Sequence, residues 1–432
     1  MATTAPAQHQ FSAVHSRHGG AAVDVALVAV PLLAVLFNSQ IASATVLIVF
    51  ASLAAMIWLR LDRLPVTIAR AWPVLLIPAF ALLSTLWSDL PSATVRYGFL
   101  YLITIALGIC IGGMLERRAL LIGLFAVFTF YNLAGFLFGG SVSVGVEQDS
   151  AFSGLAPSKN MAGNTAAVGL MLCLAVLSLA MQRRRMFLFV LALAMLPLSA
   201  WLLWSSLSTG ALVSGTAAIF CLIVWLASQR MPVQFRGAVL ATVGLALIAA
   251  LLTRDIWLPA LFDMVLSGSG KDAGLTGRVD LWRKADALIA RQPWLGHGYA
   301  AFWIPGNLDA EAFWREFGIK ARVGFNFHNT PREVLVSLGY VGAALLGTVV
   351  LVGTLISFVR TMVRPDPTRI FFCAWLVYTL IRAYFESLGV AQMNIDALLG
   401  SAALALAFVQ KDTQPLLERP GAEAAVTRSA PA

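Results

Sequence analysis

Residues 187–205 read FLFVLALAMLPLSAWLLWS, an apolar run without a single charged side chain. A helix of about 20 such residues is long enough to cross the hydrocarbon core of a bilayer. It also satisfies its own backbone hydrogen bonds there, which a lipid-exposed loop cannot do. The run therefore predicts a membrane-spanning helix. Arg183, Arg184 and Arg185 stand just before it and predict that this end faces the cytoplasm.

The whole chain has the composition of a protein that lies in lipid. Of its 432 residues, 59% are hydrophobic and 12% are charged, whereas about 25% of an ordinary soluble domain is charged. Similar apolar runs recur and predict an all-α integral membrane protein of about twelve transmembrane helices. We place these helices at residues 22–38, 41–59, 71–87, 97–114, 119–139, 162–181, 187–205, 210–228, 237–253, 334–359, 370–387 and 391–409.

Basic residues gather after every second predicted helix. They are Arg60, Arg63 and Arg70, then Arg117 and Arg118, then Arg183, Arg184 and Arg185, then Arg230 and Arg236, and then Arg360, Arg364 and Arg369. Such clusters mark the cytoplasmic side of a membrane. They also account for much of the net charge of +9, so we expect no nucleic-acid partner.

This alternation predicts the organisation of the chain. Residues 1–21 and 410–432 form disordered cytoplasmic tails, residues 22–253 hold the first nine helices, and residues 334–409 hold the last three. Residues 254–333 form one large periplasmic loop between the ninth and tenth helices, which is far longer than an ordinary connection.

Polar chemistry gathers in this loop. Residues 276–292 have helical spacing and predict an amphipathic helix against the membrane surface. His297 and His328, the histidines beyond the N-terminal tail, also lie in the loop. Each is either a structural or a functional residue, and His328 is the stronger functional candidate because it adjoins a predicted helix. Neither has a cysteine or a close third ligand beside it, so we predict no metal and no cofactor.

Charged residues near the outer ends of predicted helices are further candidates. Lys159 and Asn160 either start a helix or help to hold an anionic phosphate at its N-terminus. Arg382 and Glu386 are four residues apart in a predicted helix, so they either pair to stabilise the bundle or belong to a site. Arg278 opens the amphipathic stretch and, taken alone, is a surface cation.

Several short segments of the chain follow one another in a specific order. They are LSTLWSDLP (83–91) followed by Arg96, residues 154–163 with Lys159 and Asn160, TGR (276–278) with Trp282, PWLGHG (293–298), and FHN (327–329) with LGYVG (338–342). Together they resemble the O-antigen ligase and polysaccharide polymerase superfamily, especially its exopolysaccharide-polymerase-like branch, over most of the chain. Ser208, Thr209 and Gly210 stand where many relatives carry serine followed by arginine or lysine. Arg96 or Lys159 is then the substitute for one expected phosphate-binding cation.

The resemblance implies a metal-independent glycosyltransferase at the periplasmic face of the bacterial inner membrane. Its implied donor is a saccharide linked to undecaprenyl pyrophosphate, its acceptor is a saccharide or lipid A-core, and it lies in the lipid bilayer. Arg278 would stabilise the leaving pyrophosphate. His328 would remove the proton of the acceptor hydroxyl, orient the acceptor or contact the pyrophosphate. The residues expected to bind substrate are Arg96, Lys159, Asn160, Ser208, His297, Asn329, Arg382 and Glu386.

Four functions remain open at this point. The main interpretation is a polymerase of exopolysaccharide or O-antigen repeat units, and the next is an O-antigen ligase that transfers the glycan to lipid A-core. Transfer to protein is a third. A transporter of lipid-linked glycans is the alternative from another class, but transporters place ionisable groups near the bilayer midplane. Here the candidates gather on one face, which favours an enzyme.

Overall fold

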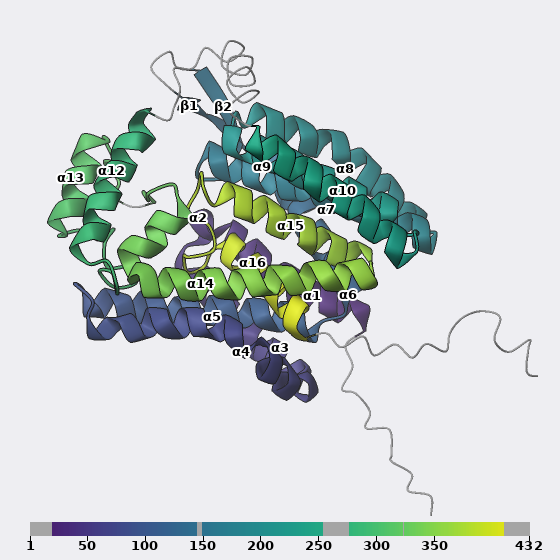
Figure 1. The fold of residues 1–432 in the computed structure, drawn as a ribbon, viewed down its shortest axis with the longest axis horizontal. Coiled ribbons are helices and arrows are strands. Elements are labelled where there is room, and N and C mark those ends of the chain that lie inside the picture. The colour runs from purple at the N-terminus through teal and green to yellow at the C-terminus, as the bar shows by residue number, and fades with distance from the viewer. Residues whose placement is uncertain (1–19, 145–148, 254–275, 323, 410–432) are drawn as a thin grey trace, which may run out of the picture.

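The computed structural model describes residues 20–144, 149–253, 276–322 and 324–409. These residues are almost entirely helical (Figure 1). The helices are α1 (Ala21–Leu36), α2 (Asn38–Ile41), α3 (Ser43–Leu59), η1 (Leu61–Arg63), α4 (Leu64–Leu83), η2 (Ser84–Leu86), α5 (Pro91–Met114), α6 (Arg117–Phe138), α7 (Lys159–Arg183), α8 (Met186–Ser205), α9 (Thr209–Ser228), α10 (Val233–Leu252), α12 (Thr276–Arg291), α13 (Leu308–Glu316), α14 (Thr330–Val363), α15 (Pro367–Arg382) and α16 (Ile395–Val409). Strands β1 (Gly140–Val144) and β2 (Asp149–Gly154) pair as an antiparallel hairpin.

Every predicted apolar segment overlaps one of these helices. Within the described residues, seven helical stretches are long and apolar enough to cross a membrane. They are Leu61–Leu86, Pro91–Met114, Arg117–Phe138, Lys159–Arg183, Met186–Ser205, Thr209–Ser228 and Thr330–Val363. Three further apolar helices, α1, α3 and α16, are shorter. The predicted all-α membrane fold is thus confirmed at this level, while the number of spans stays a prediction. The predicted tails, apart from Gly20 and Ala21, and residues 254–275 of the large loop lie outside the described residues.

The longest of the described helices, α14, is broken near its N-terminal end. Gly339 has φ 63° and ψ −167°, a conformation open to glycine and costly for other residues. The break leaves backbone groups without partners inside the helix. A lipid-facing helix could not leave them unpaired, so they must bond to another part of the chain.

The segment 293–298 supplies these partners. Tyr340 and Val341 donate their backbone N–H groups to the carbonyls of Pro293 (2.8 Å) and Trp294 (3.1 Å). In return, the N–H groups of residues 297 and 298 donate to the carbonyls of residues 336 and 337, each at 2.9 Å. The two sequence motifs PWLGHG and LGYVG are therefore two halves of one local structure.

The part of the chain that includes α12 and α13 has a core of its own. Helices α12 and α13 stand side by side at one end of the bundle (Figure 1). Their buried side chains pack with those of the following loop, and the shared core consists of Leu281, Ala285, Leu288, Ile289, Phe302, Ala310, Phe313, Trp314, Phe327 and Val336. The helical spacing of residues 276–292 places Val279 on one face with Trp282, Leu288 and Ile289, but Val279 is 47% exposed. The core holds the start of α12 and the start of α14 in fixed positions.

We expect Gly339→Ala to destabilise the protein by about 1–3 kcal/mol, the usual cost of a strained backbone conformation. The added Cβ would also meet the carbonyl oxygen and carbon of Trp294. Thermal unfolding in detergent measures the effect. Gly347→Ala is the matched control, because Gly347 lies in the same helix with nothing within 4 Å of an added Cβ. A melting temperature equal to wild type in Gly339→Ala would contradict this account of the break.

The predicted orientation is tested by labelling. After replacement of the four native cysteines, Ser150→Cys and Lys320→Cys should react with a membrane-impermeant thiol reagent added outside intact inner-membrane spheroplasts. Gln182→Cys, near the cytoplasmic Arg cluster, should not react until the membrane is opened. All three positions are exposed in the structure, so accessibility does not distinguish them. Labelling of residue 182 alone would show that the orientation is opposite to the predicted one.

Candidate active site

The carboxylate of Glu386 joins three parts of the chain. Its Oε1 accepts hydrogen bonds from Asn160 Nδ2 (2.6 Å) and Arg278 Nη2 (3.2 Å). Its Oε2 lies 3.0 Å from His328 Nδ1. The side chain of Glu386 is only 12% exposed. Four of the predicted site residues therefore form one cluster, which we call the Glu386 cluster.

The ends of four helices deliver these residues. Asn160 lies in the first turn of α7, Arg278 in the first turn of α12, and His328 just before α14. Glu386 lies in the turn after α15, which ends at Arg382. The predicted helix 370–387 is therefore too long at its end. Because the backbone turns after Arg382, Glu386 faces α7 and α12.

Hydrogen bonds attach this turn to the start of α14. Thr330 Oγ1 donates to the carbonyl of Glu386 and accepts from the N–H of Leu388, both at 2.8 Å. Asn329 donates from Nδ2 to the carbonyl of Tyr384 (2.9 Å) while its Oδ1 caps α14. Asn329, predicted to bind substrate, thus holds the backbone on both sides of the cluster.

The backbone and side chain of His328 are both constrained. Its φ is 49°, in the left-handed region that few non-glycine residues adopt. The Asn326 side chain accepts the N–H of His328 at 2.8 Å and supports this conformation. The imidazole is 27% exposed. Its Nδ1 bonds to Glu386, and its Nε2 has no hydrogen-bond partner among the described residues.

Arg278 is not a freely solvated surface cation. Its Nη1 donates to the carbonyl of Phe385 (2.9 Å) and its Nη2 to Glu386, with 25% of the side chain exposed. Two of its N–H bearing nitrogens are therefore held in the cluster. The remaining exposure leaves the guanidinium accessible to a ligand.

Arg382 lies beneath the cluster and is 2% exposed. Its Nη2 donates to the carbonyl of Asn160 (2.7 Å), and its guanidinium carbon is 5.7 Å from the centre of the Tyr378 ring. Within the described residues its Nε and Nη1 have no hydrogen-bond partner. Among the described residues, no ion pair joins Arg382 to Glu386, which pairs with Arg278 instead. Of the two alternatives for Arg382 and Glu386, a place in one site is the one that the structure favours.

The positive charges around Glu386 keep it ionised. Burial raises the pKa of this carboxyl, but the hydrogen bond and charge of His328, with the charges of Arg382 and Arg278, outweigh burial and lower the pKa below its usual range. Glu386 therefore carries a negative charge at neutral pH. It can accept hydrogen bonds from His328, Arg278 and Asn160 together.

Ser208 extends the cluster to a further helix. Ser208 is buried before the first turn of α9, and its Oγ donates to Asn160 Oδ1 at 3.1 Å. Because that oxygen is occupied, the amide nitrogen of Asn160 points to Glu386. Ser208 and Asn160 thus fix the orientation of the carboxylate from the side opposite His328.

Three predicted site residues have other surroundings. His297 is buried, with Nδ1 2.7 Å from Asp89 and Nε2 3.3 Å from the carbonyl of Leu288, in the segment that seals the α14 break. Arg96 is exposed on α5 with its guanidinium 5.5 Å from the centre of the Tyr97 ring. Lys159 precedes Asn160 and is partly buried. The structure favours a structural role for His297.

Glu333 supports the cluster but was not singled out from the sequence. It accepts hydrogen bonds from the N–H of Phe327 (3.0 Å), Trp303 Nε1 (3.1 Å) and Ser387 Oγ (3.2 Å). Residues 327 and 387 adjoin His328 and Glu386, so Glu333 fixes the spacing between them. An acidic residue in the first turn of an apolar helix was the available signal.

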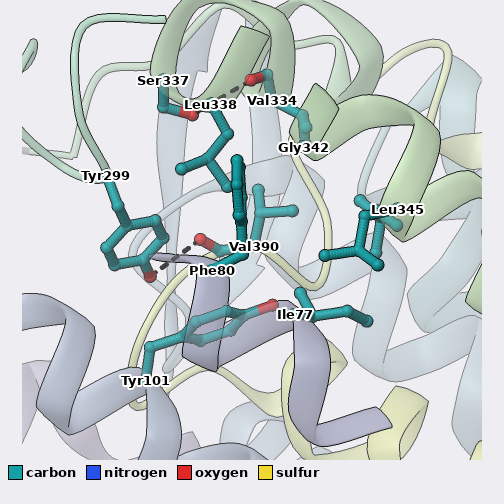
Figure 2. A pocket seen from close by; sticks show the side chains of 11 residues that line it. Ile77, Phe80, Tyr101, Tyr299, Val334, Ser337, Leu338, Gly342, Leu345 and Val390 are labelled. Carbon is teal, nitrogen blue, oxygen red and sulfur yellow. Dashed lines mark hydrogen bonds between the residues drawn. The ribbon is translucent and has the colours of Figure 1, made fainter. Parts of the chain in front are cut away.

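An apolar pocket lies between α4, α5 and α14. Figure 2 shows its lining, which comes from α4, α5, α14 and the loops at Tyr299 and Val390. Tyr299 donates its hydroxyl to the carbonyl of Val390 at 3.0 Å (Figure 2). The lining of this pocket includes none of the charged residues of the cluster, so the pocket suits an apolar group. Among the described residues, no group of three or more His, Cys, Asp or Glu side chains could hold a metal ion.

Much of this chain is similar to known proteins. Residues 194–347 match a family model described as O-antigen ligase. The chain is also 29% identical over 290 residues to the exopolysaccharide production protein ExoQ of Rhizobium meliloti (strain 1021). That match covers 66% of this chain and 65% of ExoQ, which is slightly less than two thirds of the relative. The family region includes Ser208, Arg278, His297, His328 and Asn329, whereas Asn160, Arg382 and Glu386 lie outside it.

Proposed function

Because the chain belongs to the O-antigen ligase and polysaccharide polymerase superfamily, we propose that it polymerises repeat units of an exopolysaccharide or O-antigen at the periplasmic face of the bacterial inner membrane. The donor is a saccharide on undecaprenyl pyrophosphate, and the acceptor is a second saccharide. The observation that carries the proposal is the contact of His328 and Arg278 with one carboxylate, because it brings a proton acceptor and a phosphate-binding cation together.

In the proposed reaction, an acceptor hydroxyl oxygen attacks the anomeric carbon of the donor sugar. The new glycosidic bond forms as the bond from that carbon to the pyrophosphate oxygen breaks, and the bonding electrons leave with the lipid pyrophosphate. His328 Nε2 takes the hydroxyl proton and later releases it to solvent. A sugar hydroxyl is a poor nucleophile at neutral pH, so a positioned base accelerates the attack.

The two arginines serve the leaving group. Negative charge on the pyrophosphate grows as its bond to the sugar breaks, so a fixed guanidinium stabilises the transition state more than the ground state. Arg278 is partly exposed at the cluster and can take this role. Arg382 offers Nε and Nη1, which are buried without partners among the described residues. Such groups cost about 1–3 kcal/mol each when unpaired, so a phosphate oxygen is a favourable ligand for them.

The remaining predicted residues bind or support the substrates. Asn160 and Ser208 orient Glu386, and Asn329 holds the turn after α15. Arg96 and Lys159 stay candidates for the outer phosphate or sugar. The proposed reaction uses no metal and no nucleotide sugar.

Transfer of the completed glycan to lipid A-core is the second candidate function, favoured by the O-antigen ligase description of the matching family. Deletion of the gene separates the two. Loss of polymerisation leaves single repeat units on the lipid carrier, whereas loss of ligation lets full-length glycan accumulate there. Vesicles containing the purified protein test the transporter alternative. Movement of the donor across the membrane without any glycosidic product would show that the protein is a transporter and not an enzyme.

Arg278→Lys should lower the turnover of purified protein markedly, because lysine keeps the charge but loses the planar fork that holds two phosphate oxygens. Arg278→Ala should lower it further. Product formation from lipid-linked donor measures both. Arg283→Ala, on the exposed side of α12, is the matched control and should retain wild-type turnover. Near-normal activity of Arg278→Ala would remove Arg278 from the site.

His328→Ala should reduce turnover by about a hundredfold or more while donor binding and membrane insertion persist. His328→Asn is a second variant that tolerates the left-handed backbone. His297→Ala should act differently: it should lower the amount of folded protein more than the turnover of each folded molecule. Wild-type turnover in both His328 variants would exclude this histidine as the base.

A further inference from the structure

We propose that Glu386 is a positioning residue that orients His328 as the base and is released from Arg278 when a donor phosphate binds. This inference rests on the proposed function. The geometry assigns Glu386 a link between the two ends of the reaction, because the same carboxylate contacts the proton acceptor and the phosphate-binding cation.

The first step concerns the proton on the imidazole. Glu386 is ionised and can only accept hydrogen bonds, so the contact with His328 requires a proton on Nδ1. A neutral imidazole with a proton on Nδ1 has its lone pair on Nε2. That nitrogen has no partner among the described residues. Glu386 therefore selects the tautomer in which the free nitrogen is the base.

The second step concerns stabilisation of the protonated base. When His328 accepts a proton it becomes a cation, and an anionic partner 3.0 Å away in a largely buried setting stabilises that cation. Asn160 and the backbone attachment through Thr330 hold the carboxylate in place. Glu386 can thus stabilise the proton transfer to His328 without touching the substrate.

The third step concerns Arg278. Its Nη2 shares Glu386 Oε1 with Asn160, while its Nη1 is anchored on the carbonyl of Phe385. A donor phosphate carries more negative charge than this carboxylate and can draw Nη2 away. Glu386 then loses one cation and interacts more strongly with His328. Donor binding would in this way prepare the base for the acceptor.

Other charged groups face the pair and define the electrostatic setting. Arg382 and Arg278 lie on the Glu386 side and favour its ionised form. Asp396, at the start of α16, lies near Arg382 and Glu386. Glu333, on α14, interacts with His328 through its charge. Replacing Glu386 by glutamine leaves these groups in place, so its effect on pH dependence reports on Glu386.

The test measures turnover against pH for purified protein with lipid-linked saccharide donor and acceptor. Glu386→Gln should reduce turnover at least about tenfold, by analogy with other orienting carboxylates. The acidic limb of its profile should move to lower pH, because the imidazolium loses its anionic partner and gives up its proton more readily. Glu386→Asp, which keeps the charge at a shorter reach, should retain the wild-type limb at reduced turnover.

Two controls separate positioning from structural support. In the His328→Ala background, Glu386→Gln should cause no further loss of turnover, since it acts through the histidine. Asp89→Asn disrupts the other His–carboxylate pair, with His297, and should not move the acidic limb. Glu386→Asp replaces Glu386→Gln in both comparisons if the glutamine variant does not fold, and its loss of turnover should then vanish in the His328→Ala background.

The outcomes distinguish the two proposals. An active wild type, an inactive His328→Ala and a Glu386→Gln with wild-type turnover and an unshifted limb would overturn the role of Glu386 alone. Equal additional losses from Glu386 substitution with and without His328 would do the same. An inactive wild type under conditions that support lipid-linked polymerisation, or a fully active His328→Ala, would overturn the proposed function itself.

Discussion

The break in α14 is stabilised by an exchange of backbone hydrogen bonds, and the part of the structure that carries the Glu386 cluster depends on it. In a bilayer a helix keeps its backbone groups paired, so it can bend sharply only where another segment supplies partners. Residues 293–298 do so at Gly339. The exchange fixes α14 to the segment after α12, and thereby sets where Arg278 and His328 lie relative to each other.

Charge is concentrated where the helix ends meet. Two arginines, a histidine and an ionised glutamate lie together near an apolar interior, where electrostatic interactions are stronger than in water. Both arginines keep some capacity to donate hydrogen bonds to a ligand. Arg278 is shared between a carbonyl and a carboxylate, and Arg382 has two nitrogens without a hydrogen-bond partner among the described residues. Such an arrangement is costly in a resting protein and favourable when an anionic ligand arrives.

The sequence predicted the helices and several members of the cluster, because both leave local signals. An apolar run of membrane length is visible in any window, and FHN or TGR are short motifs. The pairings were not visible. Arg278 and Glu386 are 108 positions apart, so no local pattern indicates that Glu386 pairs with Arg278. Of the two alternatives for Arg382 and Glu386, their ion pair is not seen among the described residues.

Tertiary contacts also decided the roles of similar residues. The sequence placed both His297 and His328 in the large loop and favoured His328 only because it adjoins a predicted helix. The structure places His297 against Asp89 and a carbonyl, so both ring nitrogens are engaged, whereas His328 keeps Nε2 available. Gly339 is a further instance, since its positive φ and the close approach of Trp294 together show why a glycine stands there.

The Glu386 cluster is divided along the chain in a way that matters for protein engineering. The family region 194–347 carries His328 and Arg278. The asparagine that contacts the carboxylate comes from α7, and the carboxylate itself comes from the turn after α15. A chimera that exchanges only the matched region between relatives would transfer His328, the proposed base, without its native counter-ion. Exchange of specificity between such proteins therefore requires the matched region, the start of α7 and the turn after α15 to be exchanged together.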